Sequence, residues 1–256
     1  MLQSNGNSEK EVSASGYCTV VTGAAGGIGF AVASRLASSG EAVMAVDLDA
    51  KRLEEKLGGL GDVVLVACDV TSDGAVERLA VEIKAKFAGV KGFVHAAGFD
   101  AMAPLGMIEP GDMQRLFAVH AVFPVRFLGW MSKKSNHAPE SSAVLISSLS
   151  AHEGAKGHVA YAAAKGAVEG ALMPAAAELA EKGIRLNAVV LGVVETEMSM
   201  GWLKKLPPER QSALRNSYPL GFGKPGAVAD AILFLLSEKA GWITAQRIFA
   251  DGGASM

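Results

Sequence analysis

Two side chains with acid–base chemistry, Tyr161 and Lys165, lie four residues apart in the segment YAAAK. The alanines between them predict a helix, and this spacing brings both side chains to one face of a helix. A phenol with its ordinary pKa of about 10 transfers protons poorly at neutral pH, but a neighbouring ammonium group stabilises the phenolate and lowers that pKa. The pair is therefore a candidate centre for proton transfer, although this spacing also occurs in helices that have no catalytic role.

A third polar side chain, Ser148, ends the apolar run VLISS. The run predicts a strand, so Ser148 lies at a strand end shortly before the helix that carries Tyr161. A hydroxyl group in that position can hold a carbonyl oxygen beside the phenol. Ser148, Tyr161 and Lys165 together form a candidate catalytic group.

The elements that must position these residues follow from an alternation of short apolar runs and longer helical patterns. The early runs TVVTGA, VMAVDL and VVLVACDV are apolar almost throughout, which is typical of strands buried on both faces of a parallel sheet. The alternation predicts an α/β fold with a doubly wound parallel sheet in a single domain and helices on both faces. We expect strands at 17–22, 42–47, 63–68, 92–95, 144–147, 185–190 and 247–250. We expect helices at 29–39, 50–57, 73–87, 111–132 and 159–182.

The glycine-rich segment TGAAGGIG at 22–29 follows the first expected strand and opens the first expected helix. Glycine is needed where a backbone turns sharply, approaches a pyrophosphate or lets a helix pack closely on a strand. The helix N-terminus would add free N–H groups and a partial positive charge. A tight loop without a ligand is the plainer interpretation, but the position between strand and helix favours a dinucleotide phosphate site.

An acidic residue, Asp47, ends the second expected strand. A carboxylate there can accept hydrogen bonds from a ribose diol and would repel a 2′-phosphate, so the pattern favours NAD(H) over NADP(H). Lys51 and Arg52 follow closely and leave NADP(H) open. Asp69, at the end of the third expected strand, is a further candidate for contact with the adenine.

A series of motifs in fixed order extends these observations over most of the chain. They are TGAAGGIG at 22–29, Asp69-Val70, HAAG at 95–98, ISS at 146–148, YAAAK at 161–165, LGVVET at 191–196 and DGG at 251–253. With them the chain resembles the short-chain dehydrogenase/reductase family in its classical form, from about residue 16 to residue 253. The resemblance implies a single Rossmann domain that binds a nicotinamide dinucleotide. It also implies hydride transfer between that cofactor and a secondary alcohol or ketone.

The resemblance also assigns roles to individual residues. Tyr161 would be the general acid–base, Lys165 would hold the nicotinamide ribose and lower the pKa of Tyr161, and Ser148 would orient the substrate oxygen. Val194 and Thr196 would reach the carboxamide. The other residues implied at the dinucleotide are Gly23, Gly27, Ile28, Gly29, Asp47, Leu48, Asp69, Val70, Ala96, Ala97 and Gly98.

His120 departs from the family pattern, because it occupies a position where the family usually has Asn. In the family that Asn helps to hold a water next to the Lys and completes a proton relay. The backbone carbonyl of His120 can still serve this role, and an imidazole can also relay a proton itself. A histidine that only packs against the sheet would instead favour a catalytically silent dinucleotide-binding sensor or scaffold. A second departure is His95-Ala96, which replaces two Asn that tie strands together in the family.

The substrate is less well specified than the reaction. The segment 197–218 breaks the strand–helix rhythm and is predicted to form a lid, and its Met198, Met200, Trp202 and Leu203 favour an apolar or partly apolar substrate. We therefore expect a secondary alcohol dehydrogenase or a 3-hydroxyacyl-type enzyme that uses NAD(H). The alternative is a 3-oxoacyl-type ketoreductase that uses NADPH.

Composition excludes several other classes of function. The charges nearly balance, with 24 Lys+Arg against 26 Asp+Glu, which predicts no general affinity for nucleic acid or an anionic membrane. The apolar runs are too short for a transmembrane helix. Cys18 and Cys68 lie in strand-like apolar runs and are expected to be buried thiols. No pair of histidines has a spacing that suits zinc, so no metal is expected.

The organisation of the chain follows from these patterns. Residues 1–16 are polar and read as a flexible tail, and the dehydrogenase domain occupies 17–256. The tail lacks the apolar core of a signal peptide, which predicts a cytoplasmic protein. The helices at 111–132 and 159–182 correspond to those that form subunit contacts in the family, so a homotetramer or homodimer is expected.

Overall fold

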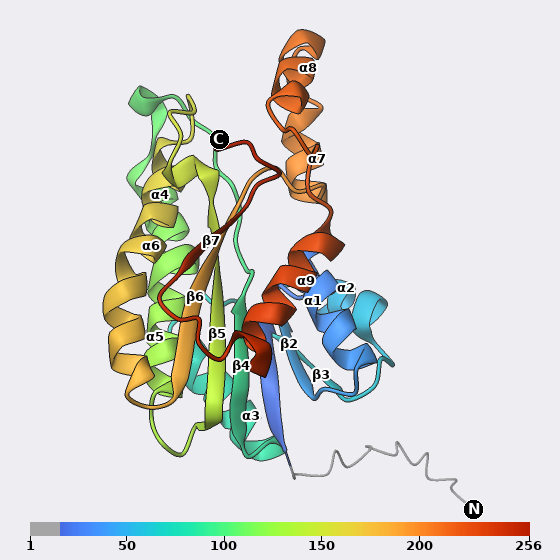
Figure 1. Cartoon of the computed structure of the whole chain (residues 1–256), viewed down its shortest axis with the longest axis vertical. Helices are drawn as coiled ribbons and strands as arrows, with labels where there is room; N and C mark the ends of the chain where they lie inside the picture. Colours follow the sequence, from blue (N-terminus) through green and yellow to red (C-terminus); the bar gives the residue numbers. More distant parts are fainter. Residues whose placement is uncertain (1–15) are drawn as a thin grey trace, which may run out of the picture.

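A parallel sheet forms the centre of the computed structural model, which describes residues 16–256. The predicted flexible tail lies almost wholly outside the described residues. The sheet has seven strands, all parallel, in the order β3-β2-β1-β4-β5-β6-β7 (Figure 1). The single-domain, doubly wound fold is thereby confirmed. The strands are β1 (Tyr17–Thr22), β2 (Val43–Asp47), β3 (Val63–Ala67), β4 (Gly89–His95), β5 (His137–Ser148), β6 (Ile184–Leu191) and β7 (Arg247–Ala250).

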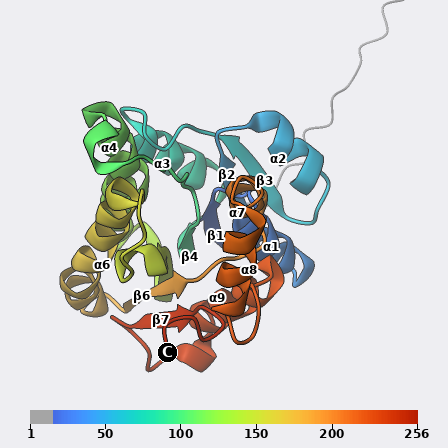
Figure 2. The ribbon, with the colours of Figure 1, turned by 90° about the horizontal axis from the view of Figure 1, so that it is seen from above.

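Helices cover both faces of the sheet (Figures 1 and 2). One face carries α1 (Gly27–Ser38), α2 (Ala50–Leu57) and α9 (Pro225–Leu236). The other carries α3 (Ala75–Lys86), α5 (Phe123–Met131) and α6 (Val159–Ala180), with α4 (Pro110–Phe117) packed against α6. Two short helices, α7 (Glu197–Leu203) and α8 (Pro208–Asn216), project beyond the carboxyl ends of the strands (Figure 1).

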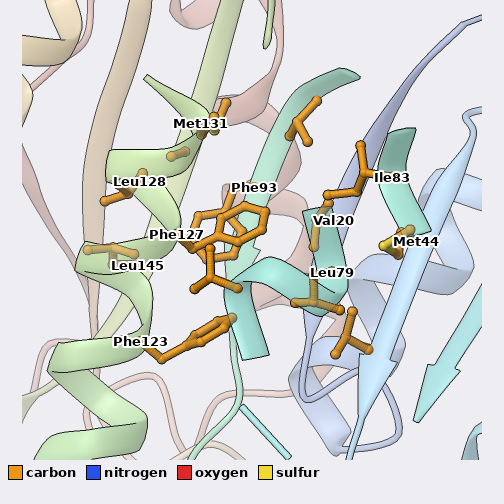
Figure 3. Close-up of a cluster of buried hydrophobic side chains, with 14 of the residues drawn as sticks. Val20, Met44, Leu79, Ile83, Phe93, Phe123, Phe127, Leu128, Met131 and Leu145 are labelled. Atoms are coloured by element: carbon orange, nitrogen blue, oxygen red, sulfur yellow. The ribbon is translucent and has the colours of Figure 1, made fainter. Parts of the chain in front are cut away.

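Side chains of the strands from β3 to β6 in the sheet order alternate between two separate cores, whereas the edge strand β7 packs against one of them. In β2, for example, Met44 and Val46 belong to the core under α3, α5 and α6, whereas Val43 and Ala45 belong to the core under α1, α2 and α9. This arrangement explains why the strands are apolar at nearly every position. Figure 3 shows the first core, where the rings of Phe93 and Phe127 lie with centroids 4.4 Å apart.

The strand order reverses at β1, which pairs with β2 on one side and with β4 on the other. Thr22, the last residue of β1, has Val46 and His95 as its neighbours in the two adjacent strands. In an open parallel sheet, a crevice forms at the carboxyl ends of the strands where the order reverses, and ligands bind there. The glycine-rich segment follows β1 directly and therefore lies at this crevice.

The expected helix at 111–132 is interrupted. A π-helical turn, η2 (Ala118–Val122), separates α4 from α5 and carries His120. Pro124 gives a physical reason, because it has no N–H to donate to the carbonyl of His120 as an α-helix requires. The turn brings His120 into the site described next, and single π turns are frequent at functional sites.

Candidate functional site

A first cavity opens at the crevice between the ends of β1, β2 and β4. It is lined by Gly23, Gly27, Ile28, Gly29, Asp47, Leu48, Asp69, Val70, Ala96, Ala97, Gly98 and Thr196, among others. All of these residues were predicted to contact a dinucleotide, and the fold brings them together. Arg52, which the sequence analysis considered in the choice between NAD(H) and NADP(H), also lines this cavity, and so do Arg115 and Glu197, which no motif singled out.

The backbone of the glycine-rich segment leaves room that any side chain would fill. Gly23 has a φ of +65°, and a Cβ there would lie 2.7 Å from the backbone of Ala96. A Cβ at Gly27 would lie 2.7 Å from Cγ2 of Thr196. The N-terminus of α1 has no side-chain cap, so its first N–H groups remain available to an anion. This cradle fits the pyrophosphate of a dinucleotide.

Asp47 is held in place at the edge of this cavity. Its Oδ2 accepts a hydrogen bond from the backbone N–H of Ala25 at 2.9 Å, and its Oδ1 accepts one from that of Asp49 at 3.2 Å. The carboxylate is thus fixed between the glycine-rich segment and the start of α2. Its position fits contact with a ribose diol, as expected.

Arg52 and Lys56 of α2 are both paired with Glu197, the first residue of α7. The Nη2 atom of Arg52 lies 2.7 Å from Oε2 of Glu197, and Nζ of Lys56 lies 3.7 Å from Oε1. The carboxylate therefore competes for the two cations that would otherwise attract a phosphate. The pairing joins residues far apart in the sequence, which is why no local pattern indicated it.

A second cavity contains the candidate catalytic group. Ser148, Tyr161, Lys165, His120 and Val194 all line it. The two cavities share Ile28, Ala96, Ala97, Gly98, Phe99, Thr196 and Met198 as lining residues. A ligand can therefore extend from the glycine-rich segment to the phenol of Tyr161.

Burial dominates the electrostatics of Tyr161 and Lys165. Lys165 donates a hydrogen bond from Nζ to the carbonyl of Ile146 at 2.8 Å, and burial lowers its pKa to about 7. Burial, followed by the charge of Asp100, raises the pKa of Tyr161, while the nearby Ser148 hydroxyl lowers it. The expected lowering of the Tyr161 pKa by Lys165 is thus not seen in the structure. The physical reason is that burial disfavours the charged forms of both groups.

Comparison with known proteins places this geometry in a family. A family model described as Enoyl-(Acyl carrier protein) reductase matches residues 23–255. The 3-oxoacyl-acyl-carrier-protein reductase FabG of Thermotoga maritima is 34% identical over 247 residues, covering 93% of this chain and 97% of that protein. The D-threitol dehydrogenase of Mycolicibacterium smegmatis is 33% identical over 243 residues, covering 93% of this chain and 92% of that protein. A crystal structure titled short-chain dehydrogenase/reductase SDR: glucose/ribitol dehydrogenase, from Brucella melitensis, matches with a TM-score of 0.86 and 30% identity, covering 94% of this chain and 97% of that chain. The chain belongs to the short-chain dehydrogenase/reductase family.

The short-chain dehydrogenases/reductases, to which the chain belongs, are oxidoreductases that bind NAD(P)(H). Against that background, His120 is the main departure near the reacting centre. Its Nε2 lies 2.9 Å from the carbonyl of Phe99. Because a carbonyl only accepts, Nε2 carries the hydrogen and Nδ1 is an acceptor. Nδ1 is buried and has no hydrogen-bond partner.

The protonation state of His120 follows from the burial of its ring and from the charge nearby. Burial, with a contribution from the charge of Lys165, lowers the pKa of His120 to about 2, so the imidazole is neutral at working pH. Its ring meets that of Tyr161 edge-on, with centroids 5.4 Å apart. A neutral ring can accept a hydrogen bond at Nδ1 in place of the family Asn, and the structure favours this role over an imidazole that carries the proton itself.

His95 takes over the structural role of a second missing Asn. Its Nδ1 lies 2.8 Å from the hydroxyl of Thr22 and its Nε2 lies 2.8 Å from the carbonyl of Val119. Nε2 donates to that carbonyl, so Nδ1 accepts from Thr22. His95 thus joins β1, β4 and the π-helical turn.

Two histidines close to the site differ in their positions. His158 lines the second cavity. His152 is not among the lining residues, and its Nε2 lies 3.0 Å from the buried carboxylate of Glu169. Asp100 lines the cavity too, and no sequence motif singled it out.

The segment predicted to be a lid forms α7 and α8 beside the second cavity. Met198, Trp202, Leu206 and Leu214 line the cavity. Leu203 is buried in the protein instead. Of the four residues expected in the lining, Met198 and Trp202 are found there and Met200 and Leu203 are not. The lining on this side is mainly apolar but also includes Arg210 of α8, and the movement of a lid stays a prediction.

Residues 16–256 contain no group of three or more His, Cys, Asp and Glu side chains that could hold a metal ion. Within the same range, no helix has both the length and the hydropathy that crossing a bilayer requires. Cys18 and Cys68 are buried free thiols, as predicted.

Proposed function

We propose that the protein interconverts a secondary alcohol and a ketone by hydride transfer with NAD(H). The observation that carries the proposal is the continuity of two cavities, one built on the glycine-rich segment and the other on Ser148, Tyr161 and Lys165. A ligand that spans both brings a nicotinamide to the phenol of Tyr161. The substrate then occupies the remainder of the second cavity.

Tyr161 and Ser148 each have a defined task in the proposed reaction. A bound nicotinamide supplies the hydride in reduction and takes it up in oxidation. Tyr161 gives its proton to the carbonyl oxygen during reduction, and Ser148 holds that oxygen by a hydrogen bond. Because burial raises the pKa of Tyr161, the phenol is protonated at neutral pH and ready for reduction. Oxidation requires the phenolate, so its rate is expected to rise with pH.

The cofactor preference rests on Asp47 and Glu197. The fixed carboxylate of Asp47 supports NAD(H), and Glu197 is paired with Arg52 and Lys56, two of the three cations of α2. We expect wild-type protein to bind NADH at least about tenfold more tightly than NADPH. Asp47→Ser should reduce the ratio of the two affinities. Glu197→Gln should improve the binding of NADPH but not that of NADH, because it frees Arg52. Fluorescence titration with both cofactors checks this, and tighter binding of NADPH by the wild type would overturn the preference for NAD(H).

His120 gives a separate prediction. If Nδ1 accepts a hydrogen bond in the proton relay, His120→Leu should lower kcat about tenfold or more, because no acceptor remains. His120→Asn restores an acceptor and should keep kcat within about threefold of the wild type. Steady-state kinetics of both variants checks this. Equal kcat values for Leu and Asn would show that the side chain only packs.

A second candidate function is reduction of a 3-oxoacyl group with NADPH. Two observations favour it: the similarity to the FabG reductase and the presence of Arg52 in the first cavity. Turnover of a 3-oxoacyl thioester with NADPH, faster than any simple ketone with NADH, would support it.

A further inference from the structure

Two ionisable side chains beside Tyr161 have no task in the proposed reaction. Asp100 lies in the loop after β4, and His158 lies just before α6. The two loops are tied by a hydrogen bond from the backbone N–H of Ala103 to the carbonyl of Gly157, at 2.9 Å. Both side chains line the second cavity. They therefore belong to the wall that faces the substrate.

The two side chains are paired but incompletely satisfied. Nε2 of His158 lies 3.5 Å from Oδ2 of Asp100, and their side chains are 15% and 13% exposed. Oδ1 of Asp100 is buried and accepts no hydrogen bond from any of residues 16–256. Buried carboxylate oxygens almost always have donors, and such an exception calls for a ligand or an ordered water. Asp100 therefore has an unused acceptor, and its side chain is part of the cavity lining.

Asp100 lies within electrostatic range of the reacting centre. Its charge raises the pKa of both Tyr161 and Lys165. The ring of His158, its partner, has its centroid 6.5 Å from that of Tyr161. A substrate whose reacting oxygen meets the phenol thus has its neighbouring carbon atoms close to Asp100.

The chemistry of Oδ1 selects the missing group. A carboxylate oxygen only accepts, so the group must be a donor such as a hydroxyl or an ammonium. Lys165 lies in the same cavity, and the hydrogen bond to Asp100 raises the pKa of His158, which favours its cationic form. A charged ammonium group would have to be buried in the cavity wall, which costs more than burying a hydroxyl that forms a hydrogen bond, so a neutral hydroxyl is the better match.

We propose that Asp100, oriented by His158, accepts a hydrogen bond from a hydroxyl group one or two carbons from the reacting carbon of the substrate. The substrates are then diols and hydroxy ketones whose remaining part is apolar enough for Met198 and Trp202. This inference rests on the proposed alcohol–ketone activity. Asp100 would determine specificity, and His158 would be a positioning residue.

The experiment compares substrates that differ by one hydroxyl group. We would measure kcat/KM with NAD+ for butane-2,3-diol, butane-1,3-diol and butan-2-ol, and for cyclohexane-1,2-diol and cyclohexanol. The ammonium compound 3-aminobutan-2-ol separates the two kinds of donor. The wild type is expected to prefer at least one diol over its mono-alcohol by about tenfold or more, because a site built to bind a hydroxyl rejects analogues that lack it. The amino alcohol is expected to be poorer than the diol.

Variants separate recognition from a structural role. Asp100→Ala and Asp100→Asn should reduce the diol preference, which is the ratio of kcat/KM for a diol to kcat/KM for its mono-alcohol, about tenfold, and His158→Gln should reduce this ratio less. Loss of the charge of Asp100 also shifts the pKa of Tyr161 and Lys165, but that shift acts on both substrates and leaves the ratio unchanged. Glu153→Gln is the matched control, because it removes one negative charge from the same cavity. Glu153→Gln should change kcat/KM for a diol and kcat/KM for its mono-alcohol by the same factor.

The outcomes distinguish this inference from the proposed function. Equal kcat/KM for diols and mono-alcohols in the wild type would overturn the inference and leave the alcohol–ketone activity standing. Equal losses for both in the Asp100 variants would show that Asp100 and His158 only hold two loops together. A preference for the amino alcohol would overturn the choice of hydroxyl. If the wild type turns over none of the compounds, the proposed function fails and the inference falls with it.

Discussion

Replacement of Tyr161 by Phe is expected to lower kcat for hydride transfer by about a thousandfold. The phenol is the group that exchanges a proton with the substrate oxygen, and positioned acid–base groups contribute about a hundredfold to ten-thousandfold to rates. The substitution removes a single oxygen atom, and the ring that packs edge-on against His120 is kept. The variant should therefore bind NADH with a Kd within about threefold of the wild type. Stopped-flow kinetics and fluorescence titration check the two halves of this prediction.

The chain offers a matched control for this change. Tyr17→Phe removes a hydroxyl at the start of β1, a strand end remote from the carboxyl edge where the site lies. It should leave kcat unchanged. A Tyr161→Phe variant that retains more than about a tenth of the wild-type kcat would contradict the assigned role of the phenol.

Acid pH is expected to destabilise the protein strongly through two buried histidines. Burial is the largest cause in both cases, and it lowers the pKa of His95 to about 3 and that of His120 to about 2. In the unfolded chain both titrate at about 6.5. Between these values the unfolded state binds more protons than the folded state, so the free energy of unfolding falls as the pH falls. Each histidine contributes about 1.4 kcal/mol per pH unit, which gives about 5 kcal/mol between pH 6 and pH 4.

His158 changes the free energy of unfolding with pH in the opposite sense, and it does so in another range of pH. Its pKa is raised by its hydrogen bond to Asp100, so its contribution to stability is fully present below pH 6.5 and is lost as the pH rises through the folded pKa. It does not change the slope between pH 6 and pH 4. The lowered pKa values of Glu197 and Asp251 affect stability at and below the lower end of this range, so the slope between pH 6 and pH 4 reports mainly on His95 and His120.

Guanidinium unfolding at pH 6, 5 and 4 measures the slope. His120→Asn and His95→Asn should each reduce it by about half, whatever they do to stability at pH 6. His137→Gln is the control substitution, because it replaces a histidine at the start of β5 that is only partly buried. A free energy of unfolding that stays level between pH 6 and pH 4 would contradict the buried, neutral state of both rings.

The strands and the cofactor cavity were predicted well from the sequence because both depend on local patterns. β1 and β2 are buried on both faces, and β3 at the edge of the sheet is partly buried on both, which shows directly as runs of mostly apolar residues. The glycine-rich segment is likewise local, because it must join the end of β1 to the start of α1. For the same reason, the order of the motifs along the chain was enough to indicate the family.

Features that depend on contacts between distant residues could not be predicted in this way. The interruption at η2 depends on one missing N–H, at Pro124, inside an otherwise helical pattern. The pairing of Arg52 with Glu197 brings α2 and α7 together across the first cavity. The buried, unpartnered oxygen of Asp100 becomes visible only when two loops are placed side by side. The raised pKa of Tyr161 has the same origin, because burial is a property of the whole fold.

Transfer of deuterium tests the central claim most directly. NADH that carries deuterium at C4 of the nicotinamide would be mixed with the protein and a panel of acyl, steroid, sugar and small hydroxylated ketones, and the alcohols would be analysed by mass spectrometry and NMR. We predict deuterium on the carbinol carbon of at least one product with wild-type protein, and its loss in Tyr161→Phe while NADH binding is kept. Wild-type protein that binds NADH but transfers deuterium to no ketone of the panel would contradict the account and favour a dinucleotide-binding sensor or scaffold.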